Sequence, residues 1–365
     1  MKGNVLKKFL CTCLVTAAAF AATTISASAC TTIYVGGDLV EEGTPFVART
    51  EDYGSDYNKL WFISESGKWK QGDHYVGCPE YGPFEWDFTH DSYRFTYFTN
   101  DIYYDGICPE CGEKADHYSY TEFGTNEKGV SVSATETLYG NKKVTEADPY
   151  RDAEWAEANK SERIGIEETG IPTIILAEAS SAREGVKLLL DIYENYGCVA
   201  ASGVFVCDKD EVWYVENCSG TQYVAIKLND NMIFLEPNMA VIGRVDLDDE
   251  NVIASKDLIA VAKKAGTFVG DEAKNIIDFR ASYARISEKM DQRMIDGLNY
   301  LNVAYKYDSD ALVTDNTKFT ISNLDASDKL VALYTNIKAD RKLDKDDVFG
   351  YYKLSSIGKA SNQEI

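Results

Sequence analysis

The first 29 residues have the pattern of a cleavable signal peptide, and the residue after the expected cut is a cysteine. Three lysines form a positive n-region ahead of the apolar run Phe9–Ala22. Ala27-Ser28-Ala29 supplies the small residues after which signal peptidases cut. The apolar run is shorter than the ~20 residues that span a bilayer. We therefore expect a mature chain of residues 30–365 with no membrane span, secreted or at the cell surface. A retained N-terminal anchor is the alternative.

The expected mature chain is strongly acidic. The 365-residue sequence has a formal net charge of −22, and loss of the three signal-peptide lysines makes it −25. An acidic surface disfavours binding to nucleic acid and to anionic membranes. It fits a freely soluble extracellular enzyme. A homo-oligomer remains an open alternative.

Cleavage after Ala29 would give Cys30 both a thiol and an α-amine, which together can hydrolyse amides. An α-amine has a reference pKa of about 7.7–8.0, suitable for a general base at neutral pH. A terminal amine that activates its own side chain is an established form of nucleophilic catalysis. The chain has three histidines and no G-x-S-x-G, H-E-x-x-H or Gly-rich phosphate motif. A hydrolase of this sequence is therefore expected to work without a histidine base.

A cysteine directly after a signal peptide is also typical of lipoproteins, in which its sulfur is acylated. That motif prefers a Leu-type residue three positions before the cysteine, where this chain has Ala27. The residues before Cys30 suit the ordinary signal peptidase better, but the lipoprotein stays an alternative.

Seven cysteines remain after the expected cut, and an odd number indicates at least one unpaired thiol. Cys108 and Cys111 lie in C-P-E-C-G, a common zinc-knuckle turn. A structural zinc site needs four ligands, and only one knuckle is present. We therefore predict no catalytic metal and no cofactor, and leave structural zinc, a disulfide and thiols open for this pair.

Strand patterns dominate the chain, and a few helices interrupt them. Residues 30–35 and 45–49 predict two strands around a Gly turn, which places Arg49 and Asp52 near the start of the first strand. Residues 129–135 alternate as a half-buried strand, and 181–196 predict an amphipathic helix. A run of antiparallel strands is expected over 199–235, with helices near 255–265 and 281–291. This pattern is typical of an α+β domain.

Several motifs, taken in order, resemble the dipeptidase A-like family of N-terminal-nucleophile (Ntn) cysteine hydrolases. The similarity runs from Cys30 to at least Arg285. Each motif alone is unspecific, but their shared order along the chain is specific. The motifs are Ala29–Thr32, Arg49–Asp52, Gly124–Glu136, Gly170–Pro172, Trp213–Glu216 and Glu236–Asn238.

The resemblance implies a four-layer αββα sandwich with two antiparallel sheets and hydrolysis of dipeptides. It implies that Cys30 is the nucleophile and that Arg49 and Asp52 flank it. Asn238 matches an oxyanion-stabilising Asn. Glu136 stands where acylase relatives have an Asn, and we expect it to bind the amino group of a peptide substrate.

Arg285 is a further match, to a substrate-binding Arg of the family. The related penicillin V acylases and conjugated bile acid hydrolases make an N-acyl amide hydrolase the second hypothesis, and a non-enzymatic surface lipoprotein is the third. Chains of this family generally continue beyond the point that matches 350–365, so we expect the domain at 30–365 to be short or truncated at its C-terminal end.

Overall fold

The computed structural model describes residues 30–50, 59–77, 84–100, 121–135, 138–285, 291–301, 330–332 and 341–354. All strand pairs between its named strands are antiparallel. The α+β class that the sequence predicts is thus confirmed. No helix in the described part of the chain combines the length and apolar character needed to cross a bilayer.

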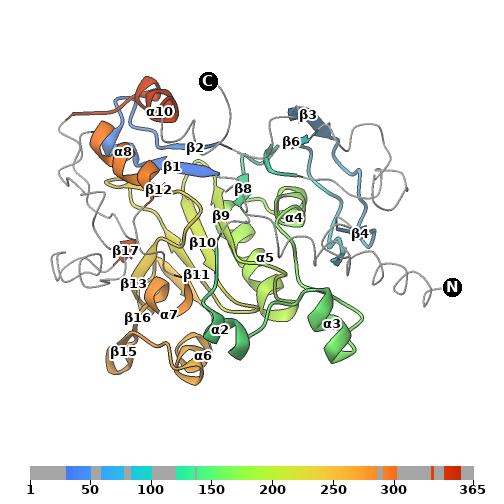
Figure 1. Ribbon diagram of the computed structural model, residues 1–365. Coiled ribbons are helices and arrows are strands. Elements are labelled where there is room, and N and C mark those ends of the chain that lie inside the picture. The colour runs from blue at the N-terminus through green and yellow to red at the C-terminus, as the bar shows by residue number, and fades with distance from the viewer. Residues whose placement is uncertain are drawn as a thin grey trace.

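The largest sheet has eight strands, in the order β14-β11-β10-β9-β8-β7-β6-β3. It forms the broad centre of the molecule (Figure 1). In that order, its strands are Val252–Ala254, Tyr223–Lys227, Val212–Asn217, Ser202–Cys207, Ser131–Thr135, Phe123–Asn126, Phe95–Asn100 and Lys59–Ser64.

A smaller sheet packs on one face of the large one, in the order β12-β1-β2. Its strands are β12 (Ile233–Glu236), β1 (Thr31–Val35) and β2 (Phe46–Thr50). The Phe234 ring of β12 lies 4.7 Å from the Tyr214 ring of the large sheet, centre to centre. Leu235, the next residue, points the other way, toward α8 (Gln292–Tyr300), because a Cβ built on Gly297 of that helix would lie 3.0 Å from the Leu235 Cδ1 atom.

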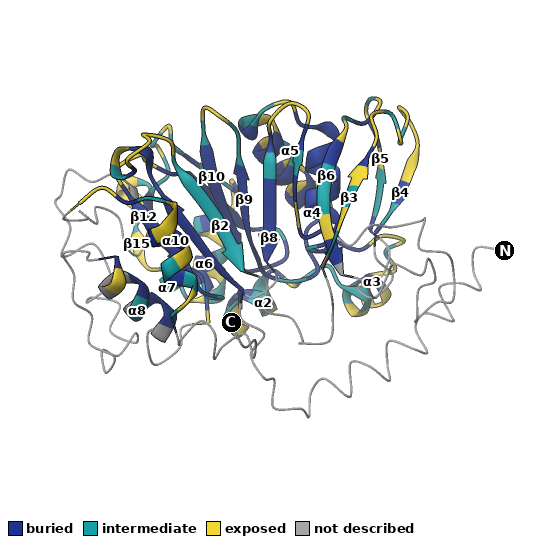
Figure 2. Cartoon of the chain, turned by 90° about the horizontal axis from the view of Figure 1, so that it is seen from above, coloured by how far each residue is buried: buried dark blue, intermediate teal, exposed yellow. Residues whose placement is uncertain are grey.

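Helices cover the outer faces of both sheets, which gives four layers (Figure 2). Helices α4 (Gly170–Glu178) and α5 (Ala182–Asn195) lie against the large sheet. Helices α8 (Gln292–Tyr300) and α10 (Lys345–Tyr352) lie against β12 and β2 of the small sheet. One apolar core fills the space between the sheets and under α8 and α10, and a second lies under α4 and α5. The order of layers is the αββα order that the resemblance implies.

Two further sheets complete the described part of the chain. One joins β15, β16, β13 and β17, and the other is the ribbon of β4 and β5. Their bounds are Gly270–Asp271, Ile276–Asp278, Ile242–Asp246, Leu330–Ala332, His74–Val76 and Glu85–Asp87. The remaining helices are α2 (Lys142–Ala147), α3 (Ala153–Asn159), α6 (Leu258–Ala265) and α7 (Phe279–Tyr283), with 3-10 turns at Gly37–Leu39 and Glu272–Lys274.

Two local predictions need correction, and one helix was not predicted. The last strand of the expected 199–235 run, β12, pairs with β1 of the small sheet and does not continue the large sheet. The helix expected over 281–291 ends at Tyr283, after which Ala284 is extended. Helix α4 has no expected counterpart, because all nine of its residues are buried and it therefore lacks the one-sided apolar pattern that marks a surface helix.

Candidate active site

Cys30 lies at the start of β1, buried with only 7% of its surface exposed. The following Thr31 pairs with Thr50 of β2, and its backbone N–H donates to the Thr50 Oγ1 atom at 3.2 Å. Thr32 pairs with Arg49. The short connection between β1 and β2 therefore returns Arg49 to the start of β1, as the two-strand prediction required.

The Arg49 guanidinium links Cys30 to the large sheet. Its Nη2 atom lies 3.4 Å from the Cys30 Sγ atom, and its Nη1 atom donates to the Ser133 Oγ atom at 3.2 Å. Nη1 also donates to the Glu122 carbonyl at 3.1 Å, and the Glu168 carboxylate lies 3.6 Å from Nη2. A buried positive charge beside sulfur favours the thiolate over the thiol. Arg49 is thus placed to activate Cys30.

Arg293 joins Cys30 to Asn238 from the other side. Its Nη1 atom donates to the Cys30 carbonyl at 2.9 Å, to the Thr31 hydroxyl at 3.0 Å and to the Asn238 Oδ1 atom at 2.9 Å. Its remaining nitrogens bind both Asp291 carboxylate oxygens at 2.8 Å and the Pro237 carbonyl at 2.8 Å. The guanidinium therefore fixes the chain around Cys30 and the side chain of Asn238 at the same time.

These contacts decide which way the Asn238 amide points. A guanidinium only donates hydrogen bonds, so the atom that faces Arg293 must be the amide oxygen. The Nδ2 group is then turned away from Arg293, and among the described residues this buried nitrogen has no hydrogen-bond partner. Asn238 also has a left-handed backbone, with φ of 53°, a conformation that favours Asn or Gly. A held, buried N–H donor without an acceptor is what an oxyanion requires.

Two buried carboxyl groups lie behind this cluster, in the space between the sheets. Glu236 of β12 is paired with Thr32, and Glu216 of β10 accepts from the Val241 and Ile242 N–H groups at 2.6 and 3.1 Å. Burial raises the pKa of Glu236 to about 7, against the opposing charges of Arg293 and Arg49. Burial, followed by the charge of Glu236, raises the pKa of Glu216 to about 8. The pair is placed to hold a proton near neutral pH.

No described contact joins the other predicted site residues to this cluster. Arg285 is exposed, and its guanidinium lies 4.3 Å from the centre of the Tyr139 ring. Asp52, Glu136, Cys108 and Cys111 lie outside the described residues, so their predicted roles stay predictions.

Arg293 and Glu168 are charged residues at this site that the sequence did not single out. Arg293 is separated from Cys30 by 263 residues, and a lone Arg near a helix start carries no signal of its own. Glu168 follows another glutamate, Glu167, just ahead of the Gly170–Pro172 motif. That motif is the one signal that could have directed attention to it.

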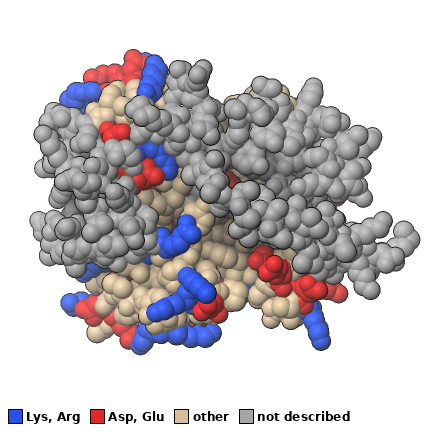
Figure 3. Space-filling view, viewed as in Figure 1, with Lys and Arg blue, Asp and Glu red and all other residues tan. Residues whose placement is uncertain are grey.

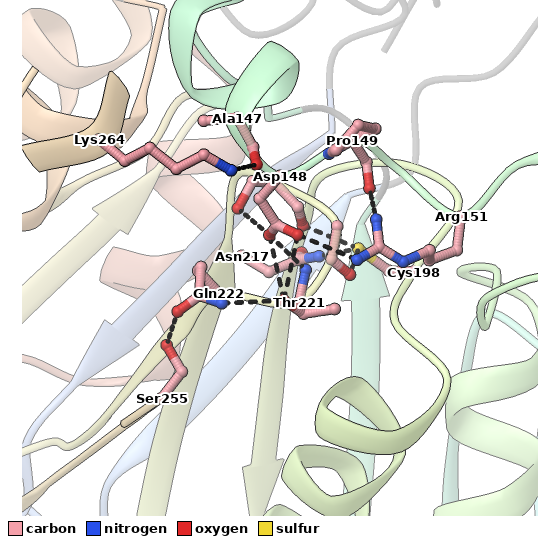
Figure 4. Close-up of polar contacts among 12 residues, drawn as sticks. Ala147, Asp148, Pro149, Arg151, Cys198, Asn217, Thr221, Gln222, Ser255 and Lys264 are labelled. Atoms are coloured by element: carbon pink, nitrogen blue, oxygen red, sulfur yellow. Dashed lines mark hydrogen bonds and ion pairs between the residues drawn. The ribbon is translucent and has the colours of Figure 1, made fainter. Parts of the chain in front are cut away.

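A second buried polar cluster lies around Asp148, next to the end of α2 (Figure 4). Its carboxylate accepts from the Ser219 hydroxyl at 2.9 Å, from the Thr221 N–H at 2.7 Å and from Arg151 at 3.1 Å. Cys198 lies at the same place and contacts the Asn217 side chain. Each Asp148 oxygen has partners here, so the cluster ties α2 to the turn after β10.

Comparison with known proteins places the chain in a family. Residues 29–329 match the model of Peptidase family C69. The chain belongs to this family. It is 33% identical over 247 residues to the "Probable dipeptidase B" of Streptococcus pyogenes serotype M6, which covers 67% of this chain and 44% of that protein. It is 32% identical over 262 residues to the "Probable dipeptidase" of Salmonella dublin, which covers 70% of this chain and 53% of that protein. The chain thus spans about half the length of the curated relatives it matches.

Solved structures give a weaker likeness. The penicillin V acylase of Agrobacterium tumefaciens matches with 14% identity and a TM-score of 0.31, over 57% of this chain and 49% of that one. A mutant of the conjugated bile acid hydrolase of Clostridium perfringens matches with 12% identity and a TM-score of 0.26, over 66% and 59% of the two chains. The family assignment therefore rests on the sequence matches.

Proposed function

We propose that this member of the C69 family is an exported cysteine dipeptidase, with mature Cys30 as nucleophile. The observation that carries the proposal is the convergence of two arginines on this residue. Arg49 lies 3.4 Å from its sulfur, and Arg293 holds both its carbonyl and the oxygen of Asn238. The names of the C69 relatives supply the substrate class.

The proposed reaction begins with attack of the Cys30 thiolate on the peptide carbonyl. Its α-amine takes the thiol proton, and Arg49 stabilises the thiolate. Asn238 Nδ2 donates to the oxyanion that forms, a contribution of about 10²–10³ in rate for one such donor. The α-ammonium then protonates the leaving amine as the C–N bond breaks. Water hydrolyses the thioester, releases the acid product and restores the thiol.

Export is part of the proposal because the mechanism needs an N-terminal Cys30. While Ala29 remains attached, the nitrogen of Cys30 belongs to a peptide bond and cannot act as a base. The signal-peptide pattern of residues 1–29 supplies the cut that creates the amine. The proposal therefore couples secretion to activation, and it excludes an acylated Cys30.

Intact mass and N-terminal sequencing of the protein exported by its own host test this step first. We expect a chain that begins at an unmodified Cys30 and hydrolyses dipeptides faster than N-acyl amides of equal size. A diacylglyceryl group on Cys30 or a cut elsewhere would contradict the proposal. A correct start with preferential turnover of N-acyl amides would favour the acylase instead.

A further inference from the structure

A row of exposed aromatic side chains crosses the outer end of the large sheet. Trp61 of β3 pairs with Phe98 of β6, which pairs with Phe123 of β7. Their exposed fractions are 55%, 38% and 41%. The Phe98 and Phe123 rings are stacked, with centres 6.0 Å apart. Single exposed apolar residues are ordinary, but a contiguous apolar surface in a soluble domain usually binds something.

The row lies on the same face of the sheet as the candidate active site. Phe123 pairs with Ser133 of β8, and residues paired across strands have their side chains on one face. The Ser133 hydroxyl accepts from Arg49, which contacts the sulfur of Cys30. The opposite face is covered, since a Cβ built on Gly124 would meet Leu176 of α4. The aromatic row therefore continues the surface on which Cys30 acts.

The small sheet ends before it reaches this row. Its last strand, β2, contacts the large sheet at β8 through Arg49 and Ser133. Strands β6 and β3 extend beyond β2, as Figures 1 and 2 show. Neighbouring strands lie about 4.8 Å apart, which places Phe123, Phe98 and Trp61 at about 5, 10 and 14 Å from Ser133 along the row.

These spacings set what can lie on the row. An extended residue spans about 3.5 Å, and the Arg49 guanidinium lies between Ser133 and the Cys30 sulfur. A dipeptide held at Cys30 therefore reaches Phe123 and Phe98 only with a large side chain. Trp61 requires a longer apolar group or one more residue. Trp61, Phe98 and Phe123 present apolar rings along the row, whereas Figure 3 shows charged side chains of both signs over α10 and over α6 and β15. The row thus offers contact for apolar groups rather than for charged ones.

We propose that Trp61, Phe98 and Phe123 form the specificity surface for a large apolar side chain of the peptide substrate. This inference rests on the proposed peptidase function. Phe123 and Phe98 contact an aromatic or branched side chain of a dipeptide, and Trp61 contacts the far end of a tripeptide. Small substrates such as alanyl-alanine gain nothing from the row.

The test compares phenylalanyl-phenylalanine with alanyl-alanine as substrates of the mature protein. Phe98→Ala should lower the ratio of their kcat/KM values by about tenfold, the scale of losing several apolar contacts. Trp61→Ala should mainly lower the kcat/KM for triphenylalanine relative to that for trialanine. Phe349→Ala is the control, because Phe349 is 58% exposed on α10. Unchanged ratios in both Phe98→Ala and Trp61→Ala would overturn the inference.

A binding measurement separates this inference from the proposed function. Calorimetry with the Cys30→Ala variant gives the Kd of each peptide without turnover. If the wild-type protein hydrolyses no peptide, the proposed peptidase function is wrong. Weaker binding of phenylalanyl-phenylalanine in a variant that also carries Phe98→Ala would still support the specificity surface. Absence of binding, or equal Kd values in the variants and the control, overturns it. Trp61 is on an edge strand, so its variant remains informative if Phe98→Ala fails to fold.

Discussion

The clusters around Arg293 and Asp148 are built from similar parts. In each, an arginine binds a carboxylate, Arg293 with Asp291 at 2.8 Å and Arg151 with Asp148 at 3.1 Å. Each also lies beside a buried cysteine, Cys30 or Cys198.

The two clusters differ in how completely their polar atoms are paired. Both Asp148 oxygens accept hydrogen bonds. Near Arg293, the buried Asn238 Nδ2 atom has no hydrogen-bond partner among the described residues. Buried polar atoms in folded proteins are nearly always paired, and exceptions call for an explanation. The pairing of Asp148 fits a cluster that stabilises the fold, whereas the unpaired Asn238 donor fits the substrate site that we propose.

Matched arginine variants give the largest expected difference between the clusters. Arg293→Met removes a buried guanidinium and strands the Asp291 carboxylate, which should cost about 3–5 kcal/mol of unfolding free energy. It should also displace Asn238 and lower kcat/KM of the remaining folded protein by at least about 100-fold. Arg151→Met should cost about 1–3 kcal/mol and leave kcat/KM within about threefold. Denaturant titration and dipeptide hydrolysis, corrected for folded fraction, measure both quantities. Equal losses of kcat/KM in the two variants would contradict the proposal that only the cluster around Arg293 takes part in catalysis.

Asn238→Gly isolates the unpaired donor. Glycine accepts the left-handed backbone at this position without strain, so the fold should persist while kcat falls by about 10²–10³. Asn275→Gly is the matched control, because Asn275 has φ of 54° and its amide donates to Asp248. Its kcat should equal that of the wild type. A normal kcat for Asn238→Gly, measured at saturating dipeptide, would remove Asn238 from the reaction.

The buried carboxyls Glu236 and Glu216 give the smallest and most gradual effect. Because their folded pKa values of about 7 and about 8 lie above 4.5, the folded state binds protons that the unfolded state has released. Their contribution to stability is therefore present below about pH 4.5 and is lost as pH rises to about 8. Glu236→Gln should flatten this decline by on the order of 3 kcal/mol. Urea unfolding at pH 5 and pH 8 measures the change. Exposed Glu154→Gln serves as control, and an unchanged slope in Glu236→Gln would show that Glu236 is ionised throughout.

Local parts of the site were predictable from sequence, and distant parts were not. Arg49 could be placed beside Cys30 because two short strands joined by a Gly turn must pair. The same reasoning failed for β12, since consecutive strands usually stay in one sheet and no local feature marks the crossing to β1. Asn238 depended on the family resemblance, because a Pro-Asn pair alone is a turn. Arg293 depends on the packing of α8 against β12, which no spacing in the sequence reveals.

The same limit on prediction from sequence applies to the elements of the fold. Helix α5 and strand β8 were expected close to where they form, because polar residues on one face reveal their period. The half-buried character predicted for β8 was wrong, since the small sheet covers its polar face and four of its five residues are buried. Helix α4 is buried on every side and was missed. The aromatic row was equally hidden, because Trp61, Phe98 and Phe123 come together only through the pairing of β3, β6 and β7.

The central claim is that Cys30 is the nucleophile of the cluster around Arg293. A matched pair of cysteine variants tests it most directly. Cys30→Ala and Cys207→Ala should each yield folded protein cut after Ala29. Burial raises the pKa of the Cys207 thiol to about 11, so this residue is a poor nucleophile and its variant should keep the wild-type kcat/KM for dipeptides. Cys30→Ala should lose at least about 10⁴-fold in kcat/KM. Retention of activity in correctly processed Cys30→Ala would contradict the account.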